Sequence, residues 1–210
     1  MTKFLVVFDV DSTLIQDEVI ELLAEAAGKR QEVAEVTERA MRGELDFADS
    51  LRDRVATLAG LPATVIETTY ERIQITLGAQ ALIDSIHARG GKVGAVSGGF
   101  SQLLEPLAKR LNIDFWKANQ LEISDSVLTG TVVGPIIDRE AKSQALLQWA
   151  DELGLTRDKT IAVGDGANDI GMMEVAGLSV AFNAKPKVRD AAQLVISSNN
   201  LEDLISVVGL

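Results

Sequence analysis

Cysteine is absent from this 210-residue sequence, and histidine occurs once. Without cysteine the chain forms no disulfides and no thiolate metal sites, and its composition suits a reducing compartment. Long hydrophobic runs are also missing, because Asp9 interrupts the first run, Phe4–Phe8, far short of a signal sequence or membrane span. The single histidine, His87, falls at the end of a predicted helix, where we do not expect a catalytic acid or base. We therefore expect a cytoplasmic protein without a membrane anchor.

Positive charge is scarce as well, with 20 Lys and Arg residues against 31 Asp and Glu residues and a net charge of −11. This balance disfavours nonspecific nucleic-acid binding and adhesion to anionic membranes, so we expect neither as a partner. It does not exclude a small anionic substrate, because a metal ion and a few local cations dominate the field inside a pocket. Hydrophobic residues make up 47% of the chain, enough for a buried core.

Short apolar runs alternate with stretches of helical periodicity along the chain. The apolar runs predict buried strands at Lys3–Phe8, Lys92–Val96, Thr160–Val163, Leu178–Ala181 and Gln193–Ile196. The stretches between them predict helices at Ala79–Arg89, Gln102–Leu111, Ala141–Leu153, Asp169–Ala176 and Pro186–Ala192. This alternation predicts an α/β fold, a Rossmann-like parallel sheet with helices on both faces.

Residues 16–76 interrupt the alternation directly after the first strand. They are rich in Glu, Ala, Leu and Arg and contain no clear strand. Breaks separate about four predicted helices, near Gly28, Gly43 and Gly60. We predict a small helical cap domain at residues 16–76, inserted into a catalytic α/β core formed by residues 1–15 and 77–210.

A second insertion, near residues 120–137, alternates around Thr129–Gly130. This pattern predicts an antiparallel β-hairpin within the core. Toward the end of the chain, the Ser197–Asn200 loop and the last few residues are predicted to be a simple surface ending.

Two carboxylates, Asp9 and Asp11, follow the first predicted strand at its carboxyl end, where open parallel sheets bind ligands. The period-two geometry of a strand puts both on one side of the chain. Because close carboxylates repel each other, the pair needs a cation or a shared proton. One interpretation is a Mg²⁺ site with a nucleophile and an acid or base. A capping cluster in a strand-to-helix turn explains the pair equally well.

Asp165 follows another predicted strand, within the small-residue segment Gly164–Asp169. Small neighbours let the backbone approach a metal and a phosphate closely. Asp165 is a natural further ligand for Mg²⁺, which prefers hard oxygen donors. Asn168 and Asp169 would orient substrate or fix neighbouring groups. The alternative is a Gly-Asp-Gly turn that caps the next helix.

Two further segments offer cationic or donor groups to an anion. Ser97 and Gly98 stand at a predicted strand-to-helix junction, where free N–H groups and the helix dipole attract anions, although Ser97 is equally suited to be an ordinary N-cap. Lys142 opens a predicted helix, and a lysine there opposes the dipole unless an anion lies near. A solvated surface lysine is the alternative for Lys142.

Taken in order, these segments resemble the haloacid dehalogenase superfamily and, within it, the phosphoserine phosphatases. Four motifs match over nearly the whole chain: Asp9–Thr13, Ser97–Gly99, Lys142 and Gly164–Asp169. The order of the motifs is far more specific than any motif alone. Two stretches of the predicted cap also look like the family's substrate-recognising segments, Asp17–Glu21 and Phe47–Val55.

The resemblance implies a two-step transfer with Mg²⁺ as the cofactor. Asp9, Asp165 and the main-chain carbonyl of Asp11 would hold the metal, and Asp9 would attack phosphorus to form a phosphoaspartyl enzyme. Asp11 would protonate the leaving oxygen and then activate water. Further residues would stabilise or position the phosphate, namely Ser97, the Gly98 N–H, Lys142 and Asn168.

Substrate choice falls to the cap in the resembling proteins. A glutamate matching Glu18 faces the substrate ammonium, and an arginine matching Arg54 pairs with its carboxylate. Met41 and Phe47 would form an apolar cover that excludes water. Without the family pattern, Glu18 and Arg54 would be read as a solvated helix face. The implied activity is hydrolysis of the small molecule O-phosphoserine to serine and phosphate, the last step of serine biosynthesis.

Three alternatives compete with this activity. In the first, the phosphoryl group passes to another alcohol, such as homoserine, in place of water. In the second, the substrate is another small phosphomonoester, for which Glu18 and Arg54 have no obvious purpose. A signalling module phosphorylated on Asp9 is the alternative from a different class, but Asp11 is placed to discharge such a phosphate. Oligomeric state is not predicted.

Overall fold

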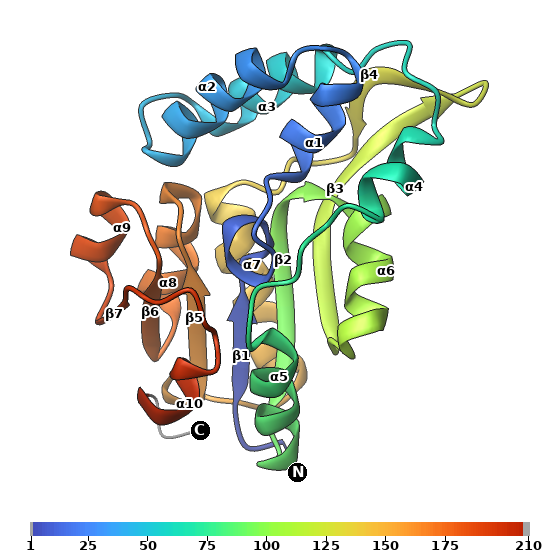
Figure 1. Cartoon of the computed structure of the whole chain (residues 1–210). Coiled ribbons are helices and arrows are strands. Elements are labelled where there is room, and N and C mark those ends of the chain that lie inside the picture. The colour runs from blue at the N-terminus through green and yellow to red at the C-terminus, as the bar shows by residue number, and fades with distance from the viewer. Residues whose placement is uncertain (1, 208–210) are drawn as a thin grey trace.

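The computed structural model describes residues 2–207, which form an α/β fold around one seven-stranded sheet in the order β4-β3-β2-β1-β5-β6-β7 (Figure 1). The strands are β1 (Leu5–Phe8), β2 (Lys92–Phe100), β3 (Phe115–Ser124), β4 (Val127–Val133), β5 (Thr160–Gly164), β6 (Leu178–Phe182) and β7 (Leu194–Ile196). Neighbouring strands run parallel except the β3–β4 pair, which is antiparallel. The predicted fold class is confirmed.

Helices cover both faces of the sheet, which explains why the sequence of β1 is apolar throughout. Val6 and Phe8 point into one core and Leu5 and Val7 into the other, so both faces of the strand are buried. Each fully buried side chain of this size contributes about 1.5–3 kcal/mol. The helices of the core are α5 (Ala79–Ala88), α6 (Ser101–Leu111), α7 (Arg139–Glu152), α8 (Ile170–Val175), α9 (Pro186–Ala191) and α10 (Asp203–Val207). The first core contains side chains of α5, α6 and α10, and the second those of α7, α8 and α9.

The predicted cap lies above the carboxyl ends of the strands (Figure 1). It contains α1 (Val19–Ala26), α2 (Arg30–Met41), α3 (Phe47–Ala56) and α4 (Val65–Tyr70). The predicted breaks are confirmed, because Gly28, Gly43 and Gly60 follow α1, α2 and α3 with φ of 67°, 73° and 81°. Glycine adopts this left-handed conformation without a steric penalty and therefore ends helices.

Backbone hydrogen bonds join the cap to the edge strand β4. Leu128 donates its N–H to Leu61 and accepts from Gly60, each at 2.8 Å, and Ala63 donates to Ser126 at 2.8 Å. The loop after α3 therefore pairs with the strand edge, which would otherwise expose unpaired N–H and C=O groups. On this side the cap is held by main-chain bonds.

The hairpin is present, but its turn lies at Asp125–Ser126, where both residues have positive φ, of 49° and 64°. The predicted centre of the alternation, Thr129–Gly130, lies inside β4. Gly130 has a different purpose, because a Cβ there would lie 2.8 Å from the Cβ of Ala59 in the cap. A glycine that looked like a turn residue instead permits a close approach between cap and hairpin.

Two other strand boundaries differ from expectation. β2 continues past Val96 to Phe100, and β3 begins at Phe115, so its first residues pair in parallel with β2 before the hairpin begins. Phe115 was not recognised as part of a strand because polar Lys117 and Asn119 interrupt the apolar pattern that marks a buried strand.

The predicted surface ending is wrong for residues 201–207. Leu201 and Leu204 are fully buried in the core that α5 also contributes to, and α10 packs on α5. Residues 208–210 of the predicted ending lie outside the described residues. Among residues 2–207, no helix is long and apolar enough to cross a membrane.

Helix α5 lies toward the end of the sheet away from the cap (Figure 1), and His87 is in its last turn. Asp114 accepts hydrogen bonds from His87 Nε2 at 2.8 Å, Lys92 Nζ at 2.5 Å and the Val93 N–H at 2.9 Å. Burial alone would raise the pKa of Asp114, but these donors outweigh it and hold the pKa below its ordinary value. His87 therefore ties a helix end to the sheet, and its predicted place at a helix end is confirmed.

Candidate active site

Lys142 is buried between two carboxylates. It lies in the first turn of α7, is fully buried, and its Nζ donates to Asp9 Oδ1 and, at 2.7 Å, to Asp169 Oδ1. Burial alone would lower the pKa of Lys142, but the two carboxylates raise it above its ordinary value. Of the two interpretations left open for Lys142, the structure therefore excludes a solvated surface lysine.

Asp169, predicted to orient substrate or fix neighbouring groups, lies beside Lys142. Its Oδ1 accepts from Lys142, and its Oδ2 accepts from the N–H groups of Asp165 and Gly166, both at 3.0 Å. This carboxylate fixes the lysine and shapes the loop that carries Asp165. The signal available in the sequence was the place of Asp169 in the Gly164–Asp169 segment that also carries Asp165.

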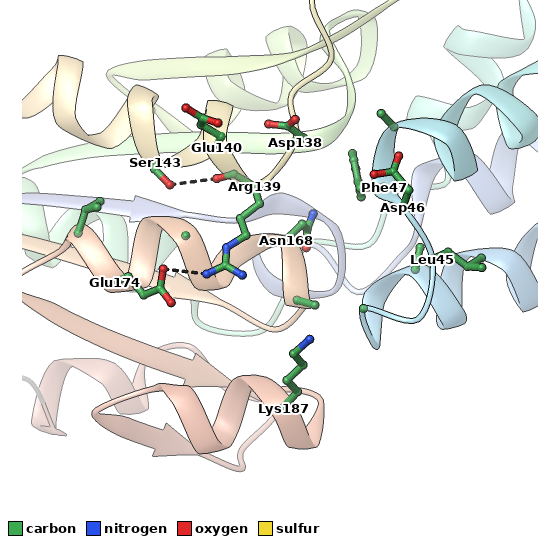
Figure 2. Close-up of a pocket in the computed structure, with 16 residues that line it drawn as sticks. Leu45, Asp46, Phe47, Asp138, Arg139, Glu140, Ser143, Asn168, Glu174 and Lys187 are labelled. Atoms are coloured by element: carbon green, nitrogen blue, oxygen red, sulfur yellow. Dashed lines mark hydrogen bonds and ion pairs between the residues drawn. The ribbon is translucent and has the colours of Figure 1, made fainter.

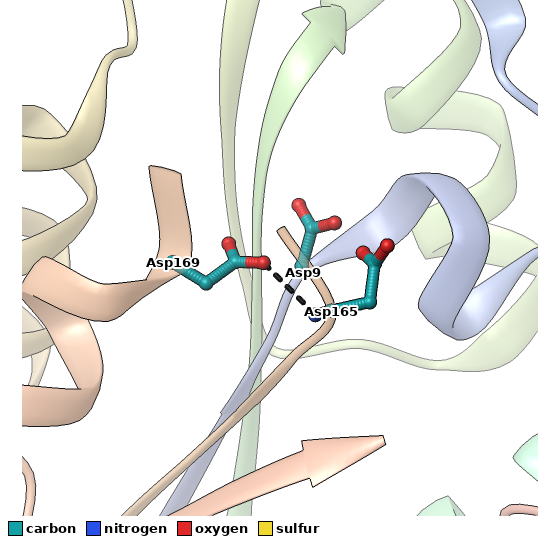
Figure 3. A group of neighbouring side chains, drawn as sticks. All are labelled: Asp9, Asp165 and Asp169. Atoms are coloured by element: carbon teal, nitrogen blue, oxygen red, sulfur yellow. Dashed lines mark hydrogen bonds between the residues drawn. The ribbon is translucent and has the colours of Figure 1, made fainter. Parts of the chain in front are cut away.

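Asp9, Asp165 and Asp169 offer carboxylate oxygens that all lie within 4.8 Å of one another (Figure 3). Both oxygens of Asp169 already accept hydrogen bonds, whereas Asp165 accepts one at 3.5 Å, from Thr13. Burial raises the pKa of Asp9 to about 7 and that of Asp165 well above its ordinary value. A hard divalent cation would offset this buried acidity, so the donor set fits such an ion. The side chain of Asp11 is not part of the group, and its predicted contribution through a carbonyl oxygen stays a prediction.

Eight predicted site residues line one small cavity of about 10 Å³ between cap and core. They are Asp9, Asp11, Glu18, Met41, Phe47, Arg54, Gly98 and Asn168, and the remaining lining residues are Ile20, Leu51 and Gly99. Of the other predicted residues, Lys142 bonds to Asp9, Asp165 belongs to the acidic group, and Ser97 precedes Gly98 in β2. The structure therefore gathers residues from both ends of the chain and from the cap.

Asp11 is buried, and its Oδ1 has no hydrogen-bond partner. Burial, followed by the charges of Glu18 and Asp9, raises the pKa of Asp11 well above its ordinary value. A raised pKa favours the protonated form of the carboxyl group, which is the form able to donate a proton.

The cap supplies both signs of charge to the cavity. Glu18 Oε1 accepts from Ser12 Oγ at 2.7 Å, and burial raises the pKa of Glu18 to about 7. Arg54 is also buried and donates from Nε to Ser50 O and from Nη1 to Thr37 Oγ1, while its Nη2 has no partner. A buried, unpaired guanidinium nitrogen is costly unless an acceptor reaches it.

Cap side chains rest directly on glycines of the core. A Cβ at Gly98 would lie 2.5 Å from Cζ of Phe47, and one at Gly166 would lie 2.7 Å from Sδ of Met41. Only glycine leaves room for the two apolar side chains at these positions. Phe47 and Met41 therefore form the apolar cover over the cavity that the resemblance implied.

Ser97 and Gly98 do not stand at a helix start as predicted. They lie within the last residues of β2, and α6 begins at Ser101. The helix-dipole argument therefore does not apply to them, because the effect falls off within the first turn. Ser97 Oγ accepts from the Gly99 N–H at 2.8 Å, which leaves its own hydrogen available to donate.

The chain matches the family model for haloacid dehalogenase-like hydrolases over residues 6–174. It is 53% identical to phosphoserine phosphatase SerB2 of Mycobacterium tuberculosis over its whole length, and spans 51% of that protein. It is 52% identical to the phosphoserine phosphatase of Streptococcus thermophilus, covering 98% of this chain and 96% of that protein.

Solved structures agree with the sequence relatives. A phospho-aspartyl intermediate analogue of phosphoserine phosphatase superposes with a TM-score of 0.96 at 40% identity, over 99% of both chains. A substrate-bound phosphoserine phosphatase superposes equally well, with a TM-score of 0.96 at 39% identity and 99% coverage of both chains. The chain belongs to the phosphoserine phosphatases of the haloacid dehalogenase-like hydrolase family.

Proposed function

We propose that this protein hydrolyses O-phosphoserine to serine and phosphate, the last step of serine biosynthesis, with the carboxylate of Asp9 as nucleophile. One observation carries the proposal: Asp9, paired with the buried Lys142, faces a closed cavity whose cap wall presents Glu18 and Arg54. We also propose a cytoplasmic location, which the cysteine-free composition allows.

The reaction proceeds in two displacements on phosphorus. A carboxylate oxygen of Asp9 forms a bond to phosphorus while the bond to the seryl oxygen breaks, and Asp11 gives its proton to the departing oxygen. Water then attacks the aspartyl phosphate as Asp11 takes up a proton. The acyl phosphate breaks, phosphate leaves, and both carboxyl groups return to their starting state.

Lys142, the Ser97 hydroxyl and the Gly98 N–H stabilise the phosphoryl oxygens, while Asn168 positions the phosphate. Lys142 also offsets the repulsion between Asp9 and an anionic substrate, because its ammonium is held beside Asp9. Asp9, Asp165 and the carbonyl oxygen of Asp11 would hold Mg²⁺. When bound, that ion supplies the further positive charge that phosphoryl transfer to a carboxylate requires.

Substrate selection rests on the two charged cap residues. The free Nη2 of Arg54 is a donor for the substrate carboxylate, and the carboxylate of Glu18 is a counter-charge for its ammonium. This pairing favours an amino-acid phosphate over a sugar phosphate.

The proposal is tested by measuring phosphate release from phosphoserine and from p-nitrophenyl phosphate in the presence of Mg²⁺. Asp9→Asn should abolish release from both substrates with an unchanged circular dichroism spectrum. Arg54→Lys should lower kcat/KM for phosphoserine about 10- to 100-fold, because lysine does not reproduce a planar guanidinium contact, and change aryl phosphate hydrolysis much less. Equal losses on both substrates would argue against Arg54 as the carboxylate partner.

A further inference from the structure

The cavity that holds the site residues is too small for any substrate of the proposed class. Its volume of about 10 Å³ is roughly the space of one water molecule. Phe47 and Met41 close it from the cap side by resting on Gly98 and Gly166. Substrate therefore reaches Asp9 only after the cap has moved away from the core.

The two sides of the cap are held to the core differently. On the hairpin side, main-chain hydrogen bonds join residues 60–63 to β4. On the opposite side, Lys185 Nζ, at the start of α9, bonds to Glu38 Oε2 of α2 at 2.7 Å. Within residues 2–207 this is the one ion pair between the cap helices and the core.

An open cleft of about 540 Å³ is lined by Ala40 of α2 and Lys187 of α9, each two residues along the chain from a partner of this ion pair (Figure 2). Its walls include Gly43 and Phe47 of the cap and Ala167, Asn168 and Lys187 of the core. Phe47 and Asn168 also line the small cavity, so the cleft reaches the closed site from outside.

Lys185 also touches the acidic centre through its main chain. Its N–H donates to the carbonyl oxygen of Asp165 at 3.0 Å. Lys185 therefore contacts the loop that carries Asp165, a proposed metal ligand. It also contacts α2, whose last residue, Met41, covers the cavity.

We propose that Lys185 is a positioning residue of the reaction, and that its ion pair with Glu38 is the latch that holds the cap closed at the edge where it opens. This inference rests on the proposed function, because it assigns the cleft as the substrate's path to Asp9. Lys185 and Glu38 expose 31% and 40% of their side chains, so the ion pair is accessible and breaks at little cost. A latch of modest strength suits a cap that opens in every turnover.

Four variants test the latch kinetically. Lys185→Met and Glu38→Gln should each raise the KM for phosphoserine about two- to fivefold with kcat kept within about twofold, and the double variant should be no worse than either single one. The exchanged pair Lys185→Glu with Glu38→Lys should restore the KM.

Arg189→Met is the matched control, because Arg189 is an exposed cation of the same helix, α9, that does not line the cleft and forms no ion pair with the cap within residues 2–207. It should leave the KM unchanged. If Arg189→Met raised the KM as much as Lys185→Met, general attraction of the anionic substrate would explain the effect and the latch would be refuted. Additive losses in the double variant would refute it as well.

The absence of native cysteine permits a direct test of the opening edge. In a Glu38→Cys, Lys185→Cys variant, a reversible bis-methanethiosulfonate bridge should reduce turnover at least about tenfold, and dithiothreitol should restore it. Each single-cysteine variant, treated alike, should keep its rate. Full turnover by the bridged protein would overturn the proposal.

All variants are assayed with both phosphoserine and p-nitrophenyl phosphate. A protein that hydrolyses only the aryl phosphate would contradict the proposed substrate. The effect of the bridge on aryl phosphate hydrolysis would still test whether the cap opens at the Lys185–Glu38 pair. A protein that hydrolyses phosphoserine at an undiminished rate when bridged would contradict the latch alone.

Discussion

Replacement of Asp169 by asparagine tests whether one buried carboxylate organises the site. Its two oxygens accept from three donors, the Lys142 ammonium and the N–H groups of Asp165 and Gly166. An asparagine of the same shape has one acceptor oxygen and an NH₂ group that only donates. In either orientation of the amide, a donor therefore faces a donor, and at least one buried group loses its partner.

Each unsatisfied buried donor costs about 1–3 kcal/mol. The aspartate also raises the pKa of Asp9, so its neutral replacement removes some repulsion and offsets part of this cost. We expect the free energy of unfolding to fall by about 1–2 kcal/mol, and kcat to fall at least about 100-fold because Lys142 and the Asp165 loop lose their common anchor.

Urea unfolding followed by circular dichroism and phosphate release from phosphoserine measure the two effects. Asp190→Asn, at an exposed position on α9, is the matched control and should leave both quantities unchanged. If Asp169→Asn kept the wild-type kcat and unfolding midpoint, the positioning role of this carboxylate would be refuted.

Asp114→Ala should lower stability by about 1 kcal/mol at pH 7. The pKa of Asp114 is lowered in the folded protein, so its contribution to stability is present above the ordinary carboxyl pKa and is lost as the pH falls through the folded pKa. The urea midpoints of the variant and the wild type should therefore converge in acid. Gly98→Ala should raise the KM for phosphoserine, because the new Cβ would lie 2.5 Å from Phe47 Cζ. Adding Phe47→Ala should relieve part of that increase. If the double variant kept the full increase in KM, the cause would lie in the main chain of β2 and not in the contact with Phe47. Leu204→Ala should lower the free energy of unfolding by about 2–5 kcal/mol, and a loss near zero would show that α10 contributes little to the core.

The site residues on strand ends were predictable because their placement is local. Asp9 and Asp165 each follow an apolar run, and parallel strands bring their carboxyl ends to one edge. Lys142 was predictable for an electrostatic reason, since its position in a helix is unfavourable without an anion. The charged cap residues Glu18 and Arg54 were identified through the family resemblance, because helical periodicity alone marks them as surface.

Features that depend on tertiary contacts were not predictable. Gly130 is a residue type typical of turns, but it lies inside a strand. The close approach of Ala59 from the cap explains why glycine occupies that position. Asp169 was predicted to fix neighbouring groups, but its bond to Lys142, 27 positions away, was not predicted. The Lys185–Glu38 ion pair joins residues 147 positions apart that belong to no motif. Sequence patterns describe the neighbours along a chain, whereas these contacts are set by how the cap meets the core.

The net charge of −11 does not determine which ligand the cavity accepts. At physiological ionic strength, exposed charges are screened over about 8 Å, so most surface acids contribute little inside the cavity. Two buried cations contribute much more, Lys142 beside Asp9 and Arg54 at the cap wall, because burial removes the water that would screen them. The proposed substrate carries one anionic group for each of them, a phosphate for Lys142 and a carboxylate for Arg54. The proposal therefore assigns the choice of a doubly anionic ligand to two buried cations and not to the net charge of the protein.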